Sequence, residues 1–183
     1  MQKLIIGLVG EMASGKDEAK KYLNEKYGAK SCKFSTPIRD VLNRLSIEVS
    51  RDNMMSLSIS LREKFGQDLF AKVIASDARV LDSDIVVVDG VRRPEDIDHL
   101  SVLPHFKLVR IEADSKLRYE RMKLTNENIG DTEKTYGEFM EDHERETEAT
   151  IPEVMEKARY SLNNDGSLED LYKQIDNLIA NLN

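Results

Sequence analysis

Short hydrophobic runs alternate along this chain with longer stretches in which hydrophobic residues recur at helical spacing. The runs predict five strands, at residues 3–9, 29–34, 84–90, 106–111 and 159–162. The continuous β-branched run at 84–90 is the clearest central strand. Residues 167–182 have helical spacing and predict a packing helix, to which we assign no chemistry. This alternation favours an α/β fold, a mostly parallel sheet covered by helices.

Two long segments lie between these strands. Residues 37–81 have a mostly helical pattern with a break around 50–52. Residues 116–157 are polar, and their middle, 125–131, has no clear apolar period, so we expect it to be exposed and mobile. The acidic part, 138–148, is typical of a solvated helix face.

The stretch from Gly10 to Asp17 follows the first apolar run and precedes a helical pattern, which is the context that a phosphate-binding P-loop requires. Glycine at 10 and 15 permits backbone angles that other residues resist, so the N–H groups of the loop can point at phosphate oxygens. Lys16 adds a point charge for the β- and γ-phosphates of a nucleotide.

Asp17 stands where a P-loop usually has serine or threonine, whose hydroxyl binds magnesium. A carboxylate can also coordinate magnesium, directly or through water. An aspartate in the first turn of a helix is alternatively stabilised by the helix dipole alone. We favour the magnesium role.

A second cluster of polar residues follows the strand at 84–90. Asp89 ends an apolar strand, which is the Walker B arrangement and places a carboxylate near the metal. Gly90 permits a close turn, and Arg92 and Arg93 follow where a second phosphate can lie. The alternative is that the two arginines are solvated beyond the strand end, and we expect at least one of them on the surface.

Other cations are candidates for the same edge of the sheet: Arg39, Arg62, Arg118, Arg121 and Arg145. Arg118 and Arg121 are three residues apart on a predicted helix and therefore share a face. They lead into the mobile acidic stretch, and a mobile segment flanked by arginines is how phosphoryl-transfer enzymes build a lid that excludes water. Arg39 begins the helix after the second strand, where a substrate phosphate can be bound. Arg62 and Arg145 are weaker candidates.

The composition narrows the class of protein. The 183 residues, 40% hydrophobic and 33% charged, suit one globular domain. A net charge of −7 argues against general nucleic-acid binding. Cys32 is the only cysteine, so no intramolecular disulfide can form and a cytoplasmic location is expected. The N-terminal apolar run is shorter than the ~20 residues of a membrane span, and the three histidines lack the spacing of a zinc site.

With these motifs, the chain resembles the nucleoside-monophosphate-kinase branch of the P-loop kinases. It is most similar to small adenylate-kinase-related, dephospho-CoA-kinase-like proteins. The resemblance covers essentially the whole chain and rests on residues 6–16, 61–66, 89–92 and 158–167. Most of these relatives have serine or threonine in place of Asp17. The Gly-Lys-Asp ending instead resembles phage deoxynucleoside-monophosphate kinases and animal-type phosphomevalonate kinase.

The resemblance implies a three-layer α/β/α fold with a five-stranded parallel sheet in the order 2-3-1-4-5. A helical acceptor-binding insert is expected at about 37–81 and a lid at about 116–150, within one domain of residues 1–183. ATP and Mg²⁺ are the implied cofactors. The implied ATP-binding residues are Gly10, Ala13, Ser14, Gly15, Lys16, Asp17, Asn164 and Gly166, and the implied metal ligands are Asp17 and Asp89.

The implied reaction is phosphoryl transfer from Mg·ATP to an acceptor phosphate. Its catalytic residues are Lys16, Asp89, Arg92, Arg118 and Arg121, and its acceptor-binding residues are Arg39, Arg62 and Arg92. AMP or another nucleoside monophosphate is the favoured acceptor, and the protein is expected to be a monomer or homodimer. No general base is needed for such an acceptor, whereas a hydroxyl acceptor would need one, with Asp89 or Asp17 as candidates.

Two alternatives remain open. The protein could be a dephospho-CoA kinase, with an apolar groove across the helices between residues 40 and 80. The residues that could line it are Met54, Met55, Leu57, Ile59 and Leu61, and core packing explains them at least as well. It could also be a regulator that binds ATP or AMP without turnover, because the loss of the hydroxyl ligand at Asp17 could impair magnesium placement.

Overall fold

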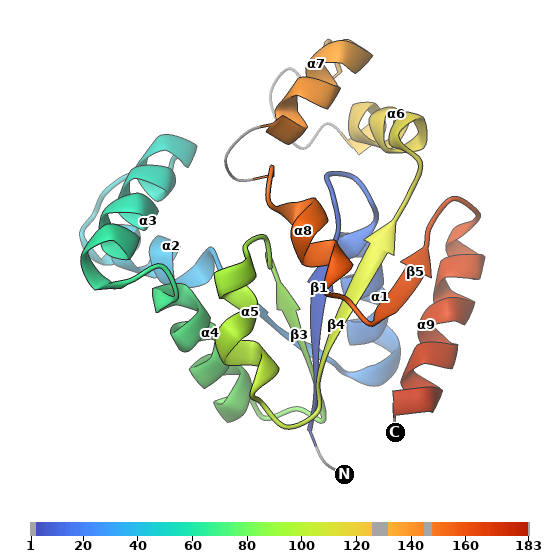
Figure 1. Cartoon of the computed structure of the whole chain (residues 1–183), viewed down its shortest axis with the longest axis horizontal. Coiled ribbons are helices and arrows are strands. Elements are labelled where there is room, and N and C mark those ends of the chain that lie inside the picture. Colours follow the sequence, from blue (N-terminus) through green and yellow to red (C-terminus); the bar gives the residue numbers. More distant parts are fainter. Residues whose placement is uncertain (1–2, 126–131, 145–147, 183) are drawn as a thin grey trace.

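The protein folds around a five-stranded parallel sheet with helices on both faces (Figure 1). The computed structural model describes residues 3–125, 132–144 and 148–182. The strands are β1 (Leu4–Val9), β2 (Lys30–Lys33), β3 (Ile85–Asp89), β4 (Phe106–Glu112) and β5 (Tyr160–Asn163). Their order in the sheet is β2-β3-β1-β4-β5, and all four neighbouring pairs are parallel. The predicted fold class and strand order are confirmed.

Nine α-helices and one short 3-10 helix lie in the described parts of the chain. They are α1 (Lys16–Tyr27), α2 (Thr36–Arg44), α3 (Arg51–Phe65), α4 (Leu69–Val80), α5 (Pro94–Ser101), α6 (Ser115–Thr125), α7 (Tyr136–Glu141), η1 (Asp142–Glu144), α8 (Ile151–Glu156) and α9 (Leu168–Leu182). None of them is long and apolar enough to cross a membrane.

Two hydrophobic cores lie on opposite faces of the sheet. One joins residues such as Val9 and Val88 to α2, α4, α5 and α8, and the other joins residues such as Leu8 and Val87 to α1 and α9. Successive residues of a strand point to opposite faces, so a strand covered on both sides is apolar throughout. This is why the run in β3 has no polar alternation.

The helical region that we predicted at 37–81 contains three helices and two breaks. The first break lies at residues 45–50, slightly before the predicted position, and Ser50 caps α3 by accepting a hydrogen bond from the Asn53 backbone N–H at 3.2 Å. The second break is at Gly66, whose φ of 107° ends α3. The prediction missed this break because it placed only one interruption in the region.

The predicted lid region is described only in part. Helices α6 and α7 lie above the carboxyl end of the sheet (Figure 1). Most of the stretch that we predicted to be mobile, residues 126–131, lies outside the described residues. So does Arg145.

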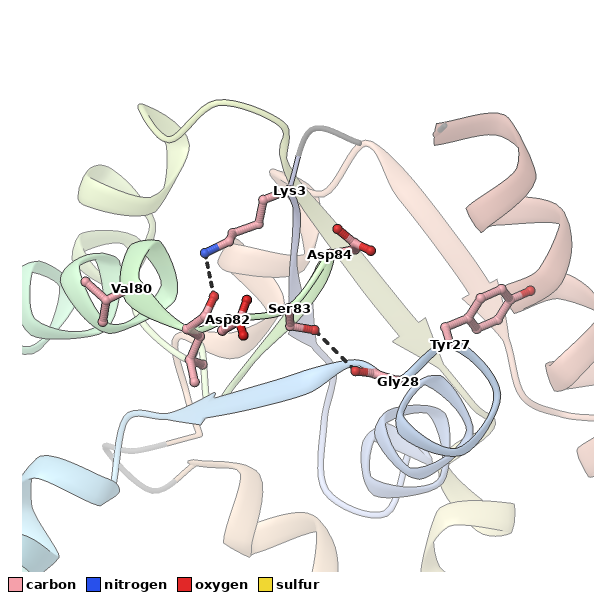
Figure 2. Close-up of a pocket in the computed structure, with 8 residues that line it drawn as sticks. Lys3, Tyr27, Gly28, Val80, Asp82, Ser83 and Asp84 are labelled. Atoms are coloured by element: carbon pink, nitrogen blue, oxygen red, sulfur yellow. Dashed lines mark hydrogen bonds between the residues drawn. The ribbon is translucent and has the colours of Figure 1, made fainter.

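An open depression lies at the other end of the sheet, beside the amino ends of β1, β2 and β3 (Figure 2). Lys3 enters it, but its Nζ donates hydrogen bonds to the carbonyl oxygens of Arg79 and Leu81, both at 2.6 Å. These carbonyls end α4, where a cation is stabilised by the helix dipole. Ser83 donates to the Gly28 carbonyl at 3.2 Å. Lys3 and Ser83 thus tie elements of the fold together, so we assign no chemistry to the depression.

Candidate active site

The loop between β1 and α1 is built for close approach of its backbone. A Cβ atom on Gly10 would lie 2.5 Å from the Ile111 carbonyl oxygen, and one on Gly15 would lie 2.1 Å from Nδ2 of Asn164. Gly15 also has a φ of 104°, and Ala13 has a φ of 58°. These left-handed angles turn the chain sharply into α1, so the first N–H groups of the helix face the loop.

Lys16 folds back over this loop. Its Nζ donates to the carbonyl oxygens of Gly10 at 2.6 Å and Glu11 at 2.8 Å. Burial lowers the pKa of Lys16, whereas the nearby carboxylate of Glu148 acts in the opposite direction. An ammonium buried among neutral carbonyls is well placed to gain from an anion in the loop.

Ser14 and Asn164 join the loop to the segment after β5. Nδ2 of Asn164 donates to the Ser14 carbonyl at 2.8 Å. The two residues are 1% and 3% exposed. Within the described residues, Oγ of Ser14 and Oδ1 of Asn164 are buried without a hydrogen-bond partner. Unpaired polar atoms are costly to bury, and here they lie beside the loop between β1 and α1. Gly166, the other residue predicted on this side, is exposed.

The two predicted metal ligands, Asp17 and Asp89, are joined by a lysine. Nζ of Lys20 lies 2.7 Å from Oδ2 of Asp89 and also pairs with Oδ1 of Asp17. Lys33 reaches Asp89 at 3.4 Å. Burial acts to raise the pKa of Asp89, but the hydrogen bond and charge of Lys20 outweigh it and lower that pKa. The same two pairs raise the pKa of Lys20 against the effect of burial.

Arg92 lies on the turn after β3 and is paired with a carboxylate. Its Nη1 lies 2.9 Å from Oε1 of Glu148, and its carbonyl oxygen accepts from the Thr150 hydroxyl at 2.8 Å. The backbone N–H groups of Arg92 and Arg93 donate to Oδ2 of Asp96 at 3.1 and 3.0 Å. The turn is therefore held from two sides, by α5 and by the segment that leads into α8.

Arg62 and Arg39 have different surroundings. Arg62 is 8% exposed, lies 3.4 Å from Asp96 and donates to the Gln67 carbonyl. Its guanidinium carbon lies 4.9 Å from the centre of the Phe70 ring. These contacts tie α3 to α4 and α5. Arg39 is exposed on α2, shortly after the carboxyl end of β2.

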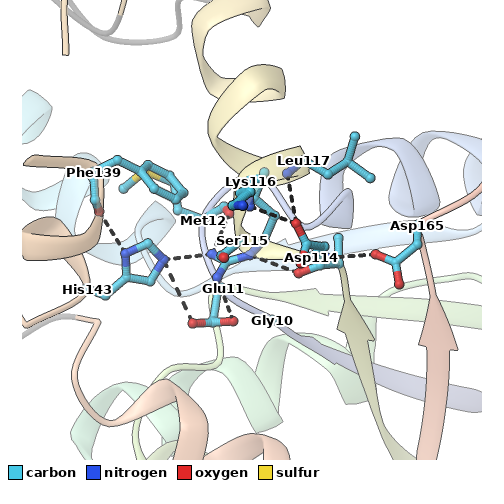
Figure 3. Close-up of polar contacts among 12 residues, drawn as sticks. Gly10, Glu11, Met12, Asp114, Ser115, Lys116, Leu117, Phe139, His143 and Asp165 are labelled. Atoms are coloured by element: carbon cyan, nitrogen blue, oxygen red, sulfur yellow. Dashed lines mark hydrogen bonds and ion pairs between the residues drawn. The ribbon is translucent and has the colours of Figure 1, made fainter. Parts of the chain in front are cut away.

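Arg118 connects the lid region to the phosphate loop. It is 3% exposed, and its Nη2 lies 3.0 Å from Oε2 of Glu11. Its Nη1 donates to the Met12 carbonyl at 3.2 Å and lies 2.7 Å from Nε2 of His143. Figure 3 shows His143 held on its other side by the carbonyl oxygen of Phe139, at 2.8 Å. Both α6 and η1 are thus fastened to the loop through Glu11.

Arg121 points toward a different partner. Its Nη2 donates to the carbonyl oxygen of Asn164 at 2.8 Å, and its Nη1 is buried without a hydrogen-bond partner in the described parts of the chain. Arg118 and Arg121 therefore share a side of α6 but reach different segments. Arg118 contacts the loop itself, and Arg121 contacts the segment after β5.

Four residues near the loop did not figure among the sequence candidates: Glu11, Lys20, His143 and Glu148. The pairing of Lys20 with Asp17 could have been predicted from the sequence, since the two residues are three positions apart on a helix and so share a face. The other three depend on contacts between distant segments. Nothing local in the sequence distinguishes Glu148 from the acidic residues around it.

Comparison with solved structures defines the class of fold. The chain superposes on a shikimate kinase from Bacteroides thetaiotaomicron with a TM-score of 0.63, 14% identity and coverage of 98% of both chains. A shikimate kinase from Acinetobacter baumannii, solved with shikimate, gives 0.54 and 17% identity over 98% and 94% of the two chains. At these identities the likeness shows the fold alone, which is that of the small P-loop kinases.

Sequence relatives place the chain more narrowly. It is 30% identical over 178 residues to a UPF0200 protein of Sulfurisphaera tokodaii, covering 97% of each chain. It is 29% identical over 184 residues to a UPF0200 protein of Thermococcus gammatolerans, covering 98% and 95%. The chain belongs to the UPF0200 family. No family model matches it.

Proposed function

We propose that the protein binds ATP in the loop between β1 and α1 and transfers its terminal phosphoryl group to a small-molecule acceptor. One observation carries this proposal. The partly buried ammonium of Lys16 lies across a loop whose Gly15 has a left-handed backbone, 2.6 Å from the Gly10 carbonyl and 2.8 Å from that of Glu11. This arrangement suits an anion between the ammonium and the first turn of α1.

The other residues at this edge have matching roles. Asn164 and Gly166 lie after β5, on the side where the resemblance expects the donor adenine. Arg118 and Arg121 supply positive charge from α6, and Arg92 supplies it from the turn after β3. Phosphoryl transfer needs little covalent chemistry from a protein, so positioning and electrostatic stabilisation are sufficient to define the site.

The surroundings of Asp17 and Asp89 show whether these two predicted ligands are suited to binding Mg²⁺. Carboxylate oxygens are donors of the kind that Mg²⁺ prefers. Asp17 and Asp89, however, already share the ammonium of Lys20. Within the described residues there is also no group of three or more acidic, histidine or cysteine side chains arranged to hold a metal. The pair does not fit a bound Mg²⁺ as it stands, because Lys20 holds both carboxylates, and magnesium dependence is a prediction from the sequence alone.

The acceptor favoured by the sequence is a nucleoside monophosphate such as AMP, with dephospho-CoA as the alternative. Arg92 and Arg39 are accessible at or near the carboxyl edge of the sheet, whereas Arg62 is buried among α3, α4 and α5. A groove for the apolar tail of dephospho-CoA could use only Met55 and Ile59 among the predicted lining residues, because these two are exposed on α3. Met54, Leu57 and Leu61 pack against the core instead.

A binding experiment tests the proposed function. Lys16→Ala should abolish measurable ATP binding by calorimetry and phosphoryl transfer, because it removes the ammonium over the loop. The matched control is Lys21→Ala, an exposed position on α1. Unchanged ATP affinity in Lys16→Ala, with the fold intact by circular dichroism, would refute the site.

A regulator that binds ATP without turnover is the second candidate, and the Lys20 bridge to Asp17 is the observation that favours it. Asp17→Thr separates the two. A large gain in turnover would support the regulator, because the hydroxyl ligand would restore a missing activity. Equal or lower turnover would support an enzyme adapted to Asp17.

A further inference from the structure

Glu148 is a carboxylate at the phosphate edge to which the proposed nucleotide site gives no role. Its side chain is 12% exposed, and its Oε1 lies 2.9 Å from Nη1 of Arg92. It also influences the titration of Lys16, the ammonium over the loop. Glu148 therefore faces the two cations between which a transferred phosphoryl group and its acceptor would meet.

The position of Glu148 is fixed by the core. Its carbonyl oxygen accepts from the Ile151 backbone N–H at 3.0 Å, at the start of α8. Ile151 and Val154 of α8 are 3% and 0% exposed and share a core cluster with Val9 at the end of β1. Thr150 also donates to the Arg92 carbonyl at 2.8 Å. The carboxylate is thus held in place by α8, which lies in front of the carboxyl end of β1 (Figure 1).

The other carboxylates near the loop are also paired with cations. Asp89 pairs with Lys20 and Lys33, and Asp17 pairs with Lys20. Glu11 pairs with Arg118. Against the effect of burial, Lys20 lowers the pKa of Asp89, which makes Asp89 a weaker base. Glu148 pairs with Arg92, whose side chain is 49% exposed, and its charge also acts on Lys16.

Resting on the proposed function, we infer that Glu148 is the general base of the reaction and that the acceptor is an alcohol. The hydroxyl proton passes to a carboxylate oxygen of Glu148, and the hydroxyl oxygen bonds to the γ-phosphorus of ATP. The bond from that phosphorus to the β–γ bridging oxygen breaks, and ADP leaves with the electron pair. A phosphate acceptor already carries its negative oxygen and needs no such base.

The charge of Glu148 also discriminates between acceptor classes. A nucleoside monophosphate that used Arg92 would bring its dianionic phosphate to a guanidinium that already holds a carboxylate. The carboxylate and the phosphate carry like charges, so they repel each other at this guanidinium. An uncharged hydroxyl meets no such repulsion and gains a proton acceptor.

The test compares the wild type with Glu148→Gln, which keeps the shape of the side chain and removes the base. Glu153→Gln is the matched control, because Glu153 lies nearby on α8 but is 58% exposed and pairs with Lys157 at 3.3 Å. Each protein is given ATP with water alone, with dephospho-CoA as a hydroxyl acceptor, or with AMP as a phosphate acceptor. ATP affinity is measured separately by calorimetry, and kcat is followed across pH.

We expect Glu148→Gln to bind ATP as the wild type does and to lose about 10²–10⁴-fold in kcat with water or dephospho-CoA. Among the described residues, Arg92 pairs with Glu148 and Lys16 interacts with it electrostatically, and both are cations. The wild-type kcat should fall on the acid side, since a protonated carboxylate accepts no proton, and this fall should vanish in Glu148→Gln. AMP should bind more tightly to the variant. Glu148→Asp should recover part of the lost rate.

Three results would overturn the inference. The first is a Glu148→Gln variant whose kcat equals that of the wild type and falls at low pH in the same way. The second is a wild type that phosphorylates AMP but neither hydroxyl, which would leave the proposed function standing. The third is a wild type that binds no ATP, or binds it and cleaves it in none of the three mixtures, which would overturn the proposed function as well.

Discussion

The ammonium of Lys20 occupies the position between the carboxylates of Asp17 and Asp89. Replacing Lys20 by methionine should empty this position and allow a divalent metal ion to bind there. Lys20 and Asp89 are 17% and 14% exposed, and their charges are 2.7 Å apart. Removing one partner of a fully buried pair costs about 3–5 kcal/mol, and an exposed pair is worth about 0.2–1 kcal/mol. Lys33 remains 3.4 Å from Asp89 and compensates in part. We therefore expect Lys20→Met to lower the free energy of unfolding by about 2 kcal/mol, between these limits.

The loss should appear as a melting temperature lower by about 4–8 °C, since a chain of this size loses about 2–4 °C per kcal/mol. Mn²⁺ or Mg²⁺ should then restore stability to the variant, by about 2.7 kcal/mol at 100 times its Kd. The wild type should gain far less, because Lys20 holds the carboxylates. Mn²⁺ binding to each protein without nucleotide can be followed by electron paramagnetic resonance.

The control and the pH dependence sharpen this experiment. Lys33→Met removes a half-exposed lysine that reaches Asp89 alone, so it should change stability by no more than ~1 kcal/mol and create no metal site. The pKa of Asp89 is lowered in the folded state, so the stability from its pairing is present above its ordinary pKa of about 3.9 and is lost as the pH falls below that value. Equal Mn²⁺ stabilisation of the wild type and Lys20→Met would refute the reasoning.

Two further substitutions test the loop and the lid contact. Gly15→Ala would force a Cβ to within 2.1 Å of Asn164 at a φ of 104°, so it should cost about 1–3 kcal/mol and abolish ATP binding, measured by thermal melting and calorimetry. Gly28→Ala is its control, since it also has a positive φ but nothing lies within 4 Å of the added atom; similar ATP affinity in both variants would contradict the loop geometry. Arg118→Met removes the buried partner of Glu11 and should lower the rate of ATP cleavage by about 10²–10³-fold, if its charge stabilises the transferred phosphoryl group. An unchanged single-turnover rate would exclude that role.

Much of the fold follows from the sequence by local rules. The five predicted runs became the five strands. The central strands β1 and β3 are apolar almost throughout because both of their faces are covered, whereas the edge strands β2 and β5 are buried at only one position each. The loop from Gly10 to Asp17 lies at the carboxyl edge of the sheet, because it follows the first strand. Asp89 and Arg92 lie at the same edge, since the carboxyl ends of parallel strands all meet there. The second break at Gly66 was missed, because a glycine within a long helical region does not by itself end a helix.

The tertiary structure decided which charges meet. Spacing places Lys20 on the same helix face as Asp17, but its contact with Asp89 joins residues 69 positions apart. Spacing also left Arg62 open to a substrate, whereas packing buries it against Asp96 and Phe70. Glu148 lies in an acidic stretch with no local mark of function, and only the docking of α8 on β1 brings it to Arg92. Sequence periodicity determines the face of the helix or strand on which a side chain lies. The residue that it contacts across the fold depends on how whole helices and strands pack, and the local sequence pattern does not encode that packing.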